Sequence, residues 1–211
     1  MRLLEIEDLA FAYQKNSAVL SGLRFHMEMG QRVGIRGSSG CGKSTLLRLI
    51  AGLERPAAGR IMINGRMVAG ARWEPPHRRA VSMVFQSPAL WSHLTVEKSL
   101  LLVNPDADQC RDMMERLGVT ALGRRRPHEL SGGEARRVAV ARALLRPHAL
   151  LLMDEPLIHL DPELKTGILA LLIALTREQN SGLIYVTHDE SELPGLVDIV
   201  YTMSGGVLHE P

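Results

Sequence analysis

Cysteine is scarce in this sequence of 211 residues, where only Cys41 and Cys110 occur. A disulfide framework is therefore not expected, and a reducing cytoplasm is the natural setting for the chain. Long apolar runs are missing as well, since the longest, from Gly167 to Leu175, falls far short of the ~20 residues that a membrane-spanning helix needs. Acidic residues interrupt the first ten positions, where a signal peptide would need its apolar segment. We therefore expect neither a membrane span nor export.

A strong charge of one sign is also missing, because 25 Lys and Arg residues stand against 23 Asp and Glu residues, for a net charge of +2. The short basic runs Arg78–Arg79 and Arg124–Arg126 are typical of solvated faces. A nucleic-acid footprint would need a more basic domain, so we expect no nucleic-acid partner.

The remaining composition is ordinary, with 45% hydrophobic and 23% charged residues. These values are typical of globular proteins and exclude intrinsic disorder, collagen and a pure coiled coil. The length suits one domain. No large regulatory domain is expected after Pro211.

Apolar periodicity indicates strands at the start of the chain. The first thirty residues alternate apolar and polar positions, as in Leu4–Glu7, which favours β structure. A short strand over Gln31–Arg36 precedes a helix over Lys43–Leu53, whose apolar positions recur at helical spacing. Asn64 and Gly65 supply the two positive-φ positions of a turn, which predicts a hairpin over residues 60–68.

The middle of the chain, approximately residues 90–147, is predicted to form an inserted helical subdomain. There, Asn104 and Pro105 are suited to open a helix that ends at Leu117, with Gly118 just beyond its C-cap. Apolar strands then alternate with helices, which is the pattern of a parallel sheet. The strands are Ala149–Met153, Leu183–Val186 and Ile199–Met203, and Asp161-Pro162 begins the helix between the first two.

A glycine-rich segment, Gly37 to Ser44, fits the pattern G-x-x-x-x-G-K-[ST] between a predicted strand and a predicted helix. Its glycines let backbone N–H groups turn around phosphate oxygens, and the following helix adds the positive end of its dipole. Lys43 would reach the β- and γ-phosphates of a nucleotide, and the Ser44 hydroxyl would bind Mg²⁺. The alternative is an ordinary glycine-rich turn.

The apolar strand Ala149–Met153 ends in two carboxylates, Asp154 and Glu155. Asp154 is suited to hold Mg²⁺ through water, and Glu155 to orient or deprotonate a water in line with the γ-phosphate. The alternative is a buried strand that ends in a solvated acidic turn, and the neighbouring P-loop motif makes it the weaker interpretation.

A second glycine pair occurs in Leu130–Glu134 (LSGGE), directly before a helical run over Ala135–Leu145. Two glycines at a helix start expose several N–H donors, which makes a second anion site. Ser131 and Glu134 also match the S-x-x-E capping box, so the segment can simply begin a helix. The two interpretations are compatible.

In this order and spacing, the motifs resemble those of the ATP-binding subunit of an ATP-binding cassette (ABC) transporter, of the importer-like branch. The match covers essentially the whole chain. The resemblance implies an α/β fold with a P-loop NTPase core, an antiparallel β edge subdomain and an inserted helical subdomain. It also implies ATP and Mg²⁺ as cofactors.

The resemblance further implies the role of each site residue. Tyr13 would stack on adenine, the Walker A loop and the signature would bind phosphates, and Asp161 would belong to the D-loop. The nucleotide-binding residues are Tyr13, Gly37, Ser38, Ser39, Gly40, Cys41, Gly42, Lys43, Ser44, Thr45, Ser131, Gly132, Gly133 and Asp161. The catalytic residues are Glu155, the Q-loop Gln86 and the switch His188, and the Mg²⁺ ligands are Ser44, Gln86 and Asp154.

Four of these residues also have plainer interpretations. Tyr13 fits a strand aromatic, Gln86 a surface amide and Asp161 a helix N-cap. His188 fits a turn histidine beside a capping box of Thr187 and Glu190.

Several positions depart from the commonest family pattern. Glu134 stands where the signature usually has Gln, and Ile158 and His159 replace small residues of the D-loop. Arg36 replaces an apolar residue and Ser38 a proline. The capping box suggests that Glu serves at position 134, and no catalytic position is missing.

For partners, the resemblance implies two subunits stacked head to tail, as a homodimer or a heterodimer, with ATP between the P-loop of one and the signature of the other. The membrane component would be separate permease chains, and this chain would act from the cytoplasmic face of the membrane, in import. The segment Gln86–Thr95 resembles the importer-type stretch that docks a permease coupling helix, with Leu90 and Trp91 as contacts. Alternatively, Leu90 and Trp91 pack within the subdomain.

The alternative functions are a soluble non-transport ABC ATPase and an exporter-associated ATPase. A DNA-repair type would need a long coiled-coil insertion and a translation type two cassettes, and neither is present; a cluster-assembly type stays open. A P-loop kinase would have no use for LSGGE, and a GTPase would need an N-K-x-D element. The transported substrate is not indicated by the sequence.

Overall fold

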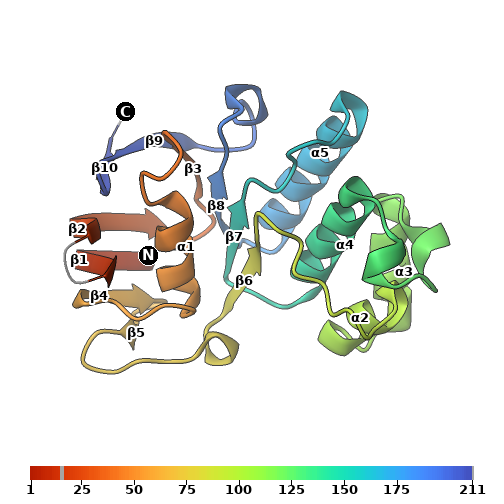
Figure 1. The fold of residues 1–211 in the computed structure, drawn as a ribbon, viewed down its shortest axis with the longest axis horizontal. Coiled ribbons are helices and arrows are strands. Elements are labelled where there is room, and N and C mark those ends of the chain that lie inside the picture. Colours follow the sequence, from red (N-terminus) through yellow and green to blue (C-terminus); the bar gives the residue numbers. More distant parts are fainter. Residues whose placement is uncertain (15–16, 211) are drawn as a thin grey trace.

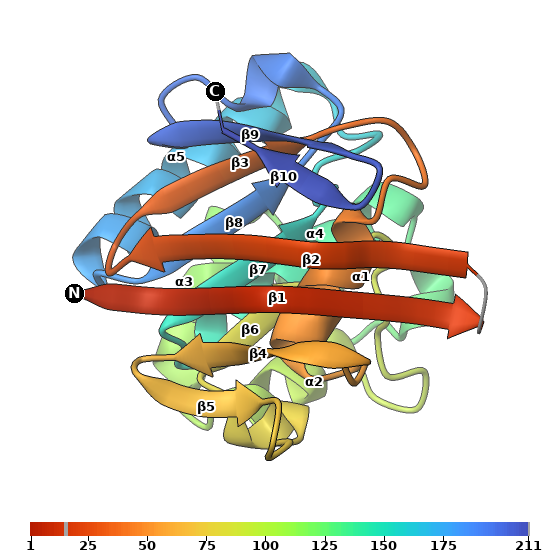
Figure 2. The same cartoon turned by 90° about the vertical axis from the view of Figure 1, so that its left-hand side faces the viewer.

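Two β-sheets organise the computed structural model, which describes residues 1–14 and 17–210 (Figures 1 and 2). The first sheet is antiparallel, in the order β2-β1-β4-β5. Its strands are β1 (Arg2–Gln14), β2 (Ser17–Glu28), β4 (Ala58–Ile63) and β5 (Arg66–Ala69). The second sheet has the order β10-β9-β3-β8-β7-β6 and is parallel except at the β10 edge. Its strands are β3 (Arg32–Arg36), β6 (Val81–Val84), β7 (Leu150–Asp154), β8 (Gly182–Val186), β9 (Ile199–Ser204) and β10 (Val207–His209).

The helices form layers around the six-stranded sheet (Figure 1). Helix α1 (Lys43–Ala51) lies between the two sheets, and α4 (Gly132–Leu145) and α5 (Pro162–Glu178) cover the opposite face. Helices α2 (Val96–Val103) and α3 (Ala107–Arg116) pack on α4 from outside. Single 3₁₀ turns occur at Pro76–Arg78, Thr120–Leu122, Pro127–Glu129 and Glu190–Glu192.

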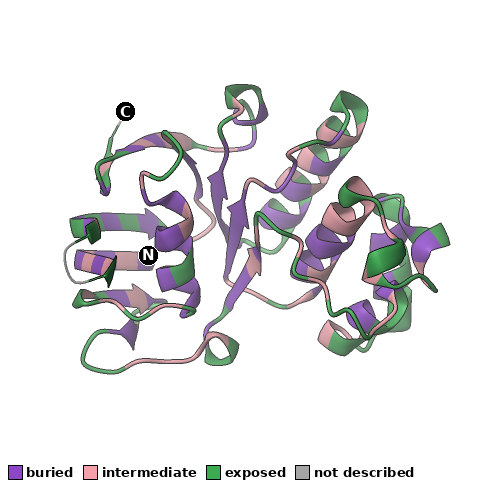
Figure 3. Ribbon diagram, in the orientation of Figure 1, coloured by how far each residue is buried: buried purple, intermediate pink, exposed green. Residues whose placement is uncertain are grey.

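Strand β7 is buried along its whole length, because each of its faces packs on a different core (Figure 3). Leu150 and Leu152 belong to the core that α1 and the antiparallel sheet complete. Leu151 and Met153 belong to the core under α4 and α5. Alternation of successive side chains between the faces of a strand explains why its sequence is one continuous apolar run.

The predicted strands and turn are confirmed with small shifts. β7, β8 and β9 lie within one residue of the expected ranges. The hairpin turn has φ of 53° at Asn64 and 71° at Gly65, as predicted. Asp161 caps α5, where its carboxylate accepts a hydrogen bond from the Leu164 N–H.

Three predictions are wrong in detail. The helix expected to open at Asn104-Pro105 begins at Ala107, because the Asp106 carboxylate accepts hydrogen bonds from two N–H groups of its first turn. The helix expected to reach Leu53 ends at Ala51, where Gly52 adopts the left-handed conformation and leaves Leu53 45% exposed. Arg79, expected on a solvated face, is only 2% exposed.

The stretch between β6 and β7 is helical as predicted, since it holds α2, α3 and α4. That it forms a separate subdomain, with bounds near residues 90 and 147, stays a prediction.

The buried Arg79 ties the end of α1 to the antiparallel sheet. Its guanidinium donates to the backbone oxygens of Leu49 and Ile50 at 2.8 and 2.7 Å, and to those of Val68 and Glu74 at 2.9 Å each. A cation at a helix C-terminus also faces the negative end of the helix dipole. Burial lowers the pKa of Arg79 to about 10, so it stays charged at neutral pH.

We expect Arg79→Met to destabilise the chain by roughly 2–4 kcal/mol, because four buried carbonyl groups lose their donor. Urea unfolding followed by circular dichroism measures the loss. Arg78→Met is the matched control at an exposed neighbouring position and should change little. Equal midpoints for the two variants would contradict the role given to Arg79.

Candidate active site

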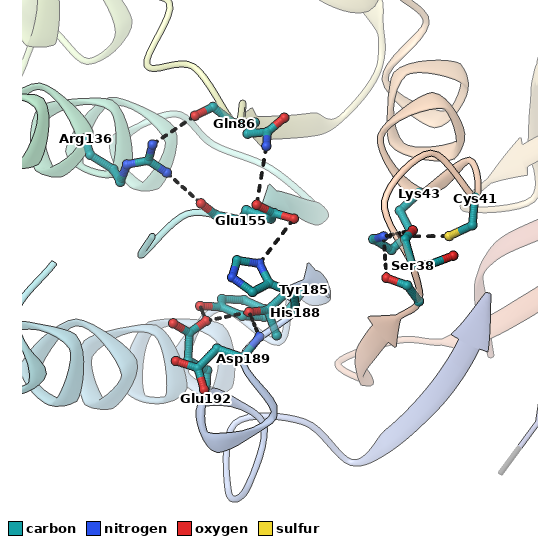
Figure 4. Close-up of polar contacts among 12 residues, drawn as sticks. Ser38, Cys41, Lys43, Gln86, Arg136, Glu155, Tyr185, His188, Asp189 and Glu192 are labelled. Atoms are coloured by element: carbon teal, nitrogen blue, oxygen red, sulfur yellow. Dashed lines mark hydrogen bonds and ion pairs between the residues drawn. The ribbon is translucent and has the colours of Figure 1, made fainter. Parts of the chain in front are cut away.

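The predicted catalytic residues gather where four adjacent parallel strands end. In the order β3-β8-β7-β6, the strands lead into the glycine-rich loop, His188, the Asp154–Glu155 pair and Gln86. Ligand sites of α/β sheets form at the carboxyl ends of the strands, which is where these residues lie. Figure 4 shows Glu155 between Gln86 and His188, and the loop of Lys43 beside them.

The glycine-rich loop runs from Gly37 to Gly42 and ends directly on α1. A Cβ on Gly37 would overlap the backbone oxygen of Met203, so the loop can pass β9 only with glycine there. Lys43 is 8% exposed, and its Nζ donates to the backbone oxygens of Gly37 and Ser38 at 2.8 and 2.9 Å. Because Gly42 offers no side chain to cap α1, the first N–H groups of the helix keep the capacity to bind an anion.

Tyr13 lies beside the start of α1. Its hydroxyl is 3.3 Å from Oγ1 of Thr45, and its ring packs edge-on against Phe11. The side chain is 54% exposed. The plain strand aromatic and the adenine platform are therefore both compatible with its surroundings.

Asp154 is 4% exposed at the end of β7. Burial raises the pKa of its carboxyl group, while a hydrogen bond from the Ser44 hydroxyl and the positive charges of Arg48 and Lys43 oppose that shift. The structure thus brings together two of the three side chains predicted to bind Mg²⁺, Ser44 and Asp154, while the side chain of the third, Gln86, contacts Glu155.

Glu155 is the centre of the site. Its carboxylate accepts a hydrogen bond from Nε2 of Gln86 at 3.3 Å, and its other oxygen lies 3.4 Å from Nδ1 of His188. Its side chain is 16% exposed, and its backbone has a φ of 48°, in the left-handed region that ordinary residues rarely adopt. Such strained backbone clusters at functional sites, where the surrounding structure holds it.

Arg136 of α4 is a neighbour of this site that the sequence analysis missed. Its guanidinium donates to the backbone oxygen of Glu155 at 2.6 Å and to that of Gln86 at 3.0 Å (Figure 4). Both acceptors are main-chain atoms, so no side-chain motif announces the contact.

The loop of His188 rests on a buried carboxylate, Glu192, which is 3% exposed. Glu192 accepts hydrogen bonds from the hydroxyls of Tyr185 and Thr187 at 2.8 and 2.9 Å, and its other oxygen lies 2.7 Å from Nζ of Lys165 in α5. The suggested capping box of Thr187 and Glu190 is not formed, because Asp189 is the N-cap and the Thr187 hydroxyl donates to Glu192.

Arg36, which stands where the family usually has an apolar residue, makes two side-chain contacts in the structure. Its guanidinium donates to Glu190 at 2.7 Å and to the Thr202 hydroxyl at 3.1 Å. The arginine thereby joins the end of β3 to the turn that follows His188.

The signature segment begins α4 with the predicted capping box. Oγ of Ser131 accepts from the Glu134 N–H at 3.2 Å, and the Glu134 carboxylate accepts from the Ser131 N–H at 2.7 Å. That N–H bond is the main reason why the pKa of Glu134 is lowered. Glu therefore completes the cap at this position, while Ser131 and Gly132 remain exposed.

The glycine-rich loop and the signature lie on helices that cover opposite faces of the sheet. Helix α1 packs on the face of β7 that carries Leu150, whereas α4 packs on the face that carries Leu151. Within the described ranges 1–14 and 17–210, no hydrogen bond or ion pair joins residues 37–45 to residues 131–133. Within one chain, the two segments predicted to bind phosphates therefore lie with helices on opposite faces of the sheet.

The sheet, the loop and the strand-end carboxylates define a nucleotide-binding protein of the P-loop class. A family model described as "ABC transporter" matches residues 20–158, and the chain belongs to the ABC transporter family. Its fold is that of the ATP-binding domains of ABC proteins. Membership excludes the P-loop kinase and GTPase alternatives.

Curated relatives are ATP-binding proteins of transport systems. The lactose transport ATP-binding protein LacK of Rhizobium radiobacter is 38% identical over 91% of this chain and 54% of its own length. The trehalose/maltose import ATP-binding protein MalK of Thermococcus litoralis is 42% identical over 86% of this chain and 52% of its own length. The chain spans about half the length of the curated relatives it matches.

Known structures confirm the fold over 99% of the chain. A bacterial Atm1-family ABC exporter with ATP bound superposes with a TM-score of 0.89 at 27% identity, over 38% of that chain. CbiO1 of Clostridium perfringens, part of the ABC transporter complex cbiONQ, gives 0.81 at 29% identity, over 87% of that chain.

We expect Glu192→Ala to destabilise the chain by roughly 2–4 kcal/mol, because the buried Tyr185 hydroxyl and the Lys165 ammonium lose their acceptor. Thermal unfolding measures the change. Glu190→Ala, in the same 3₁₀ turn, removes only an exposed ion pair and should leave the midpoint nearly unchanged. A Glu192→Ala protein as stable as the control would contradict the role given to this carboxylate.

Proposed function

We propose that the chain binds Mg-ATP and hydrolyses it as the ATP-binding subunit of an ABC importer. The observation that carries the proposal is the Glu155 carboxylate, held between Gln86 and His188 beside the loop of Lys43. The names of the import systems among the relatives support the transport context.

Nucleotide phosphates would bind in the glycine-rich loop, from Gly37 to Thr45. In this proposal Lys43 exchanges its bonds to the loop oxygens for the β- and γ-phosphates, and Tyr13 supports the adenine. The N–H groups at the start of α1 donate to phosphate oxygens.

The donor set fits Mg²⁺, which prefers oxygen ligands and is usually held by one or two protein groups together with substrate phosphates. The Ser44 hydroxyl and the Asp154 carboxylate would hold it, with the amide oxygen of Gln86 as a third ligand. Bound there, the ion would neutralise charge that develops on the β- and γ-phosphates.

Glu155 would act as the general base. Its carboxylate orients the attacking water and accepts its proton, while Gln86 and His188 hold the carboxylate in line with the γ-phosphate. His188 is 59% exposed, which leaves its ring accessible to a phosphate.

Two subunits would be needed for a complete site. The P-loop and the signature belong to helices on opposite faces of the sheet. Ser131, Gly132 and Gly133 would therefore contact the ATP of a second subunit. Asp161 would lie near the same interface. The α5 cap that Asp161 forms is compatible with that role. The departures at Ile158 and His159 would alter this interface.

The partner in the membrane would be a separate permease, with this chain on the cytoplasmic face. In the described part of the chain, no helix is both long and apolar enough to cross a membrane. A cluster-assembly ATPase is the competing function, and fractionation of cells expressing the tagged chain separates the two. Recovery in the soluble fraction without any permease would contradict the importer.

A groove of about 200 Å³ supports a docking site next to Gln86. Its lining includes Leu53, Phe85 and Trp91. Trp91 is 36% exposed, and its ring lies beneath the guanidinium of Arg142. Leu90, in contrast, is half-buried against the core under α4 and α5. We propose that Trp91 contacts a short helix of the permease and that Leu90 mainly supports the fold.

We expect Glu155→Gln to lower phosphate release by ~10²–10⁴-fold, the usual scale for losing a general base, while ATP binding survives. Unhydrolysed ATP should then accumulate between two subunits and shift the chain from monomer to dimer by mass action. A phosphate-release assay and size-exclusion chromatography with and without Mg-ATP measure the two effects.

Lys43→Ala is the control for this experiment. It should lose both hydrolysis and the ATP-driven dimer, because the cation that faces the phosphates is gone. Near-normal phosphate release from Glu155→Gln would exclude Glu155 as the base. Loss of activity without any ATP-driven dimer would leave Ser131–Gly133 as a helix cap only.

We expect Trp91→Ala to lower transport while the chain keeps its basal ATPase activity and thermal stability. Leu90→Ala is the matched control, because a half-buried leucine should cost stability instead. Transport in reconstituted vesicles and unfolding of the purified chain distinguish the two. A clear loss of stability in Trp91→Ala would show that the ring serves packing.

A further inference from the structure

Arg136 makes two contacts that the proposed catalytic residues do not account for. It lies on α4, yet its guanidinium reaches the backbone oxygens of Glu155 and Gln86, which follow β7 and β6. The side chains of the same two residues meet at 3.3 Å. One arginine fork therefore fixes both backbones on which the Glu155–Gln86 contact depends (Figure 4).

The backbone of Glu155 needs such a support. Its left-handed conformation costs free energy and persists only where the surrounding structure holds it. On one side its N–H donates to the backbone oxygen of Val186 at 2.9 Å. On the other side its carbonyl accepts from Arg136 at 2.6 Å. Without the arginine, the peptide that follows Glu155 loses its hold and can rotate.

A second arginine of α4 extends the contact along the Q-loop. Arg142 donates to the backbone oxygens of Ala89 and Pro88 at 2.9 and 3.3 Å, and Ala89 also has a left-handed φ of 46°. Residues 86–89 are thus bound to α4 by two arginines, Arg136 and Arg142, while Glu155 is bound by Arg136.

We propose that Arg136 is a positioning residue for ATP hydrolysis, which aligns the Glu155 carboxylate with the Gln86 amide and ties both to α4. The proposal rests on the function proposed above. It gives α4 a second task, because the helix that begins at Ser131 also holds the base. A nucleotide bound at Ser131–Gly133 would therefore be felt at Glu155 through one rigid helix.

Arg137 provides a matched control within the same helix. It also donates to two backbone oxygens, those of Leu117 and Gly118 at 3.0 Å each, but these lie after α3 and away from the site. A residue that only holds α4 in place would behave like Arg137. A residue that positions the base would not.

The test compares Arg136→Met, Arg136→Lys, Arg137→Met and Glu155→Gln in the purified chain, by steady-state ATPase kinetics and thermal unfolding. We expect Arg136→Met to lower kcat by ~10–100-fold, the scale of a misplaced catalytic group, with the KM for ATP changed less than ~3-fold. Arg136→Lys, which can reach one of the two oxygens, should recover part of kcat. Arg137→Met should lower thermal stability with a kcat near wild type.

A double variant, Arg136→Met with Glu155→Gln, completes the test. If Arg136 acts through Glu155, the double variant should be no slower than Glu155→Gln alone. Wild-type kcat in Arg136→Met, a kcat loss equal to that of Arg137→Met, or losses that multiply in the double variant would each overturn the proposal.

The Glu155→Gln variant distinguishes failure of the Arg136 proposal from failure of the proposed function. If Glu155→Gln is inactive and Arg136→Met is normal, only the role of Arg136 is wrong. If Glu155→Gln keeps wild-type hydrolysis, the base assignment fails and the positioning role fails with it.

Discussion

Burial of β7 from both sides is the constraint on which the rest of the structure depends. Its apolar side chains alternate between a core shared with α1 and a core shared with α4 and α5. A shift by one residue would exchange the two sets of side chains and misplace the carboxylates at the end of the strand. The packing of β7 therefore sets the position of Asp154 and Glu155 independently of any ligand.

Around that strand, the structure fixes its loops with charged groups that bind main-chain oxygens or buried hydroxyls. Arg79 closes α1, Arg136 holds the segments after β6 and β7, and Glu192 holds the turn after β8. Each such group is expensive to bury alone and is satisfied by several partners at once. Loops held in this way keep a defined shape around the candidate nucleotide site.

The two segments predicted to bind phosphates, the glycine-rich loop and the signature, belong to helices on opposite faces of the sheet. Under the proposed function, a single chain would not complete a nucleotide sandwich by itself, so subunit assembly and ATP hydrolysis would be coupled by geometry. Helix α4 would take part in both, because it begins at the signature and contacts the backbones of Glu155 and Gln86 through Arg136. The groove beside Trp91 adjoins the same helix through Arg142.

The sequence by itself determined the α/β class, the order of the strands along the chain, and the cap residues Ser131 and Asp161, because periodicity and capping are local properties. It also supplied Lys43, Asp154 and Glu155, since spacing along the chain announces these motifs. Only the tertiary structure decided that Leu90 is more buried than Trp91. It also decided the roles of Arg79, Arg136 and Glu192. Their partners are backbone atoms or residues on other elements, and a contact of that kind leaves no periodic or spaced signal in the chain that carries it.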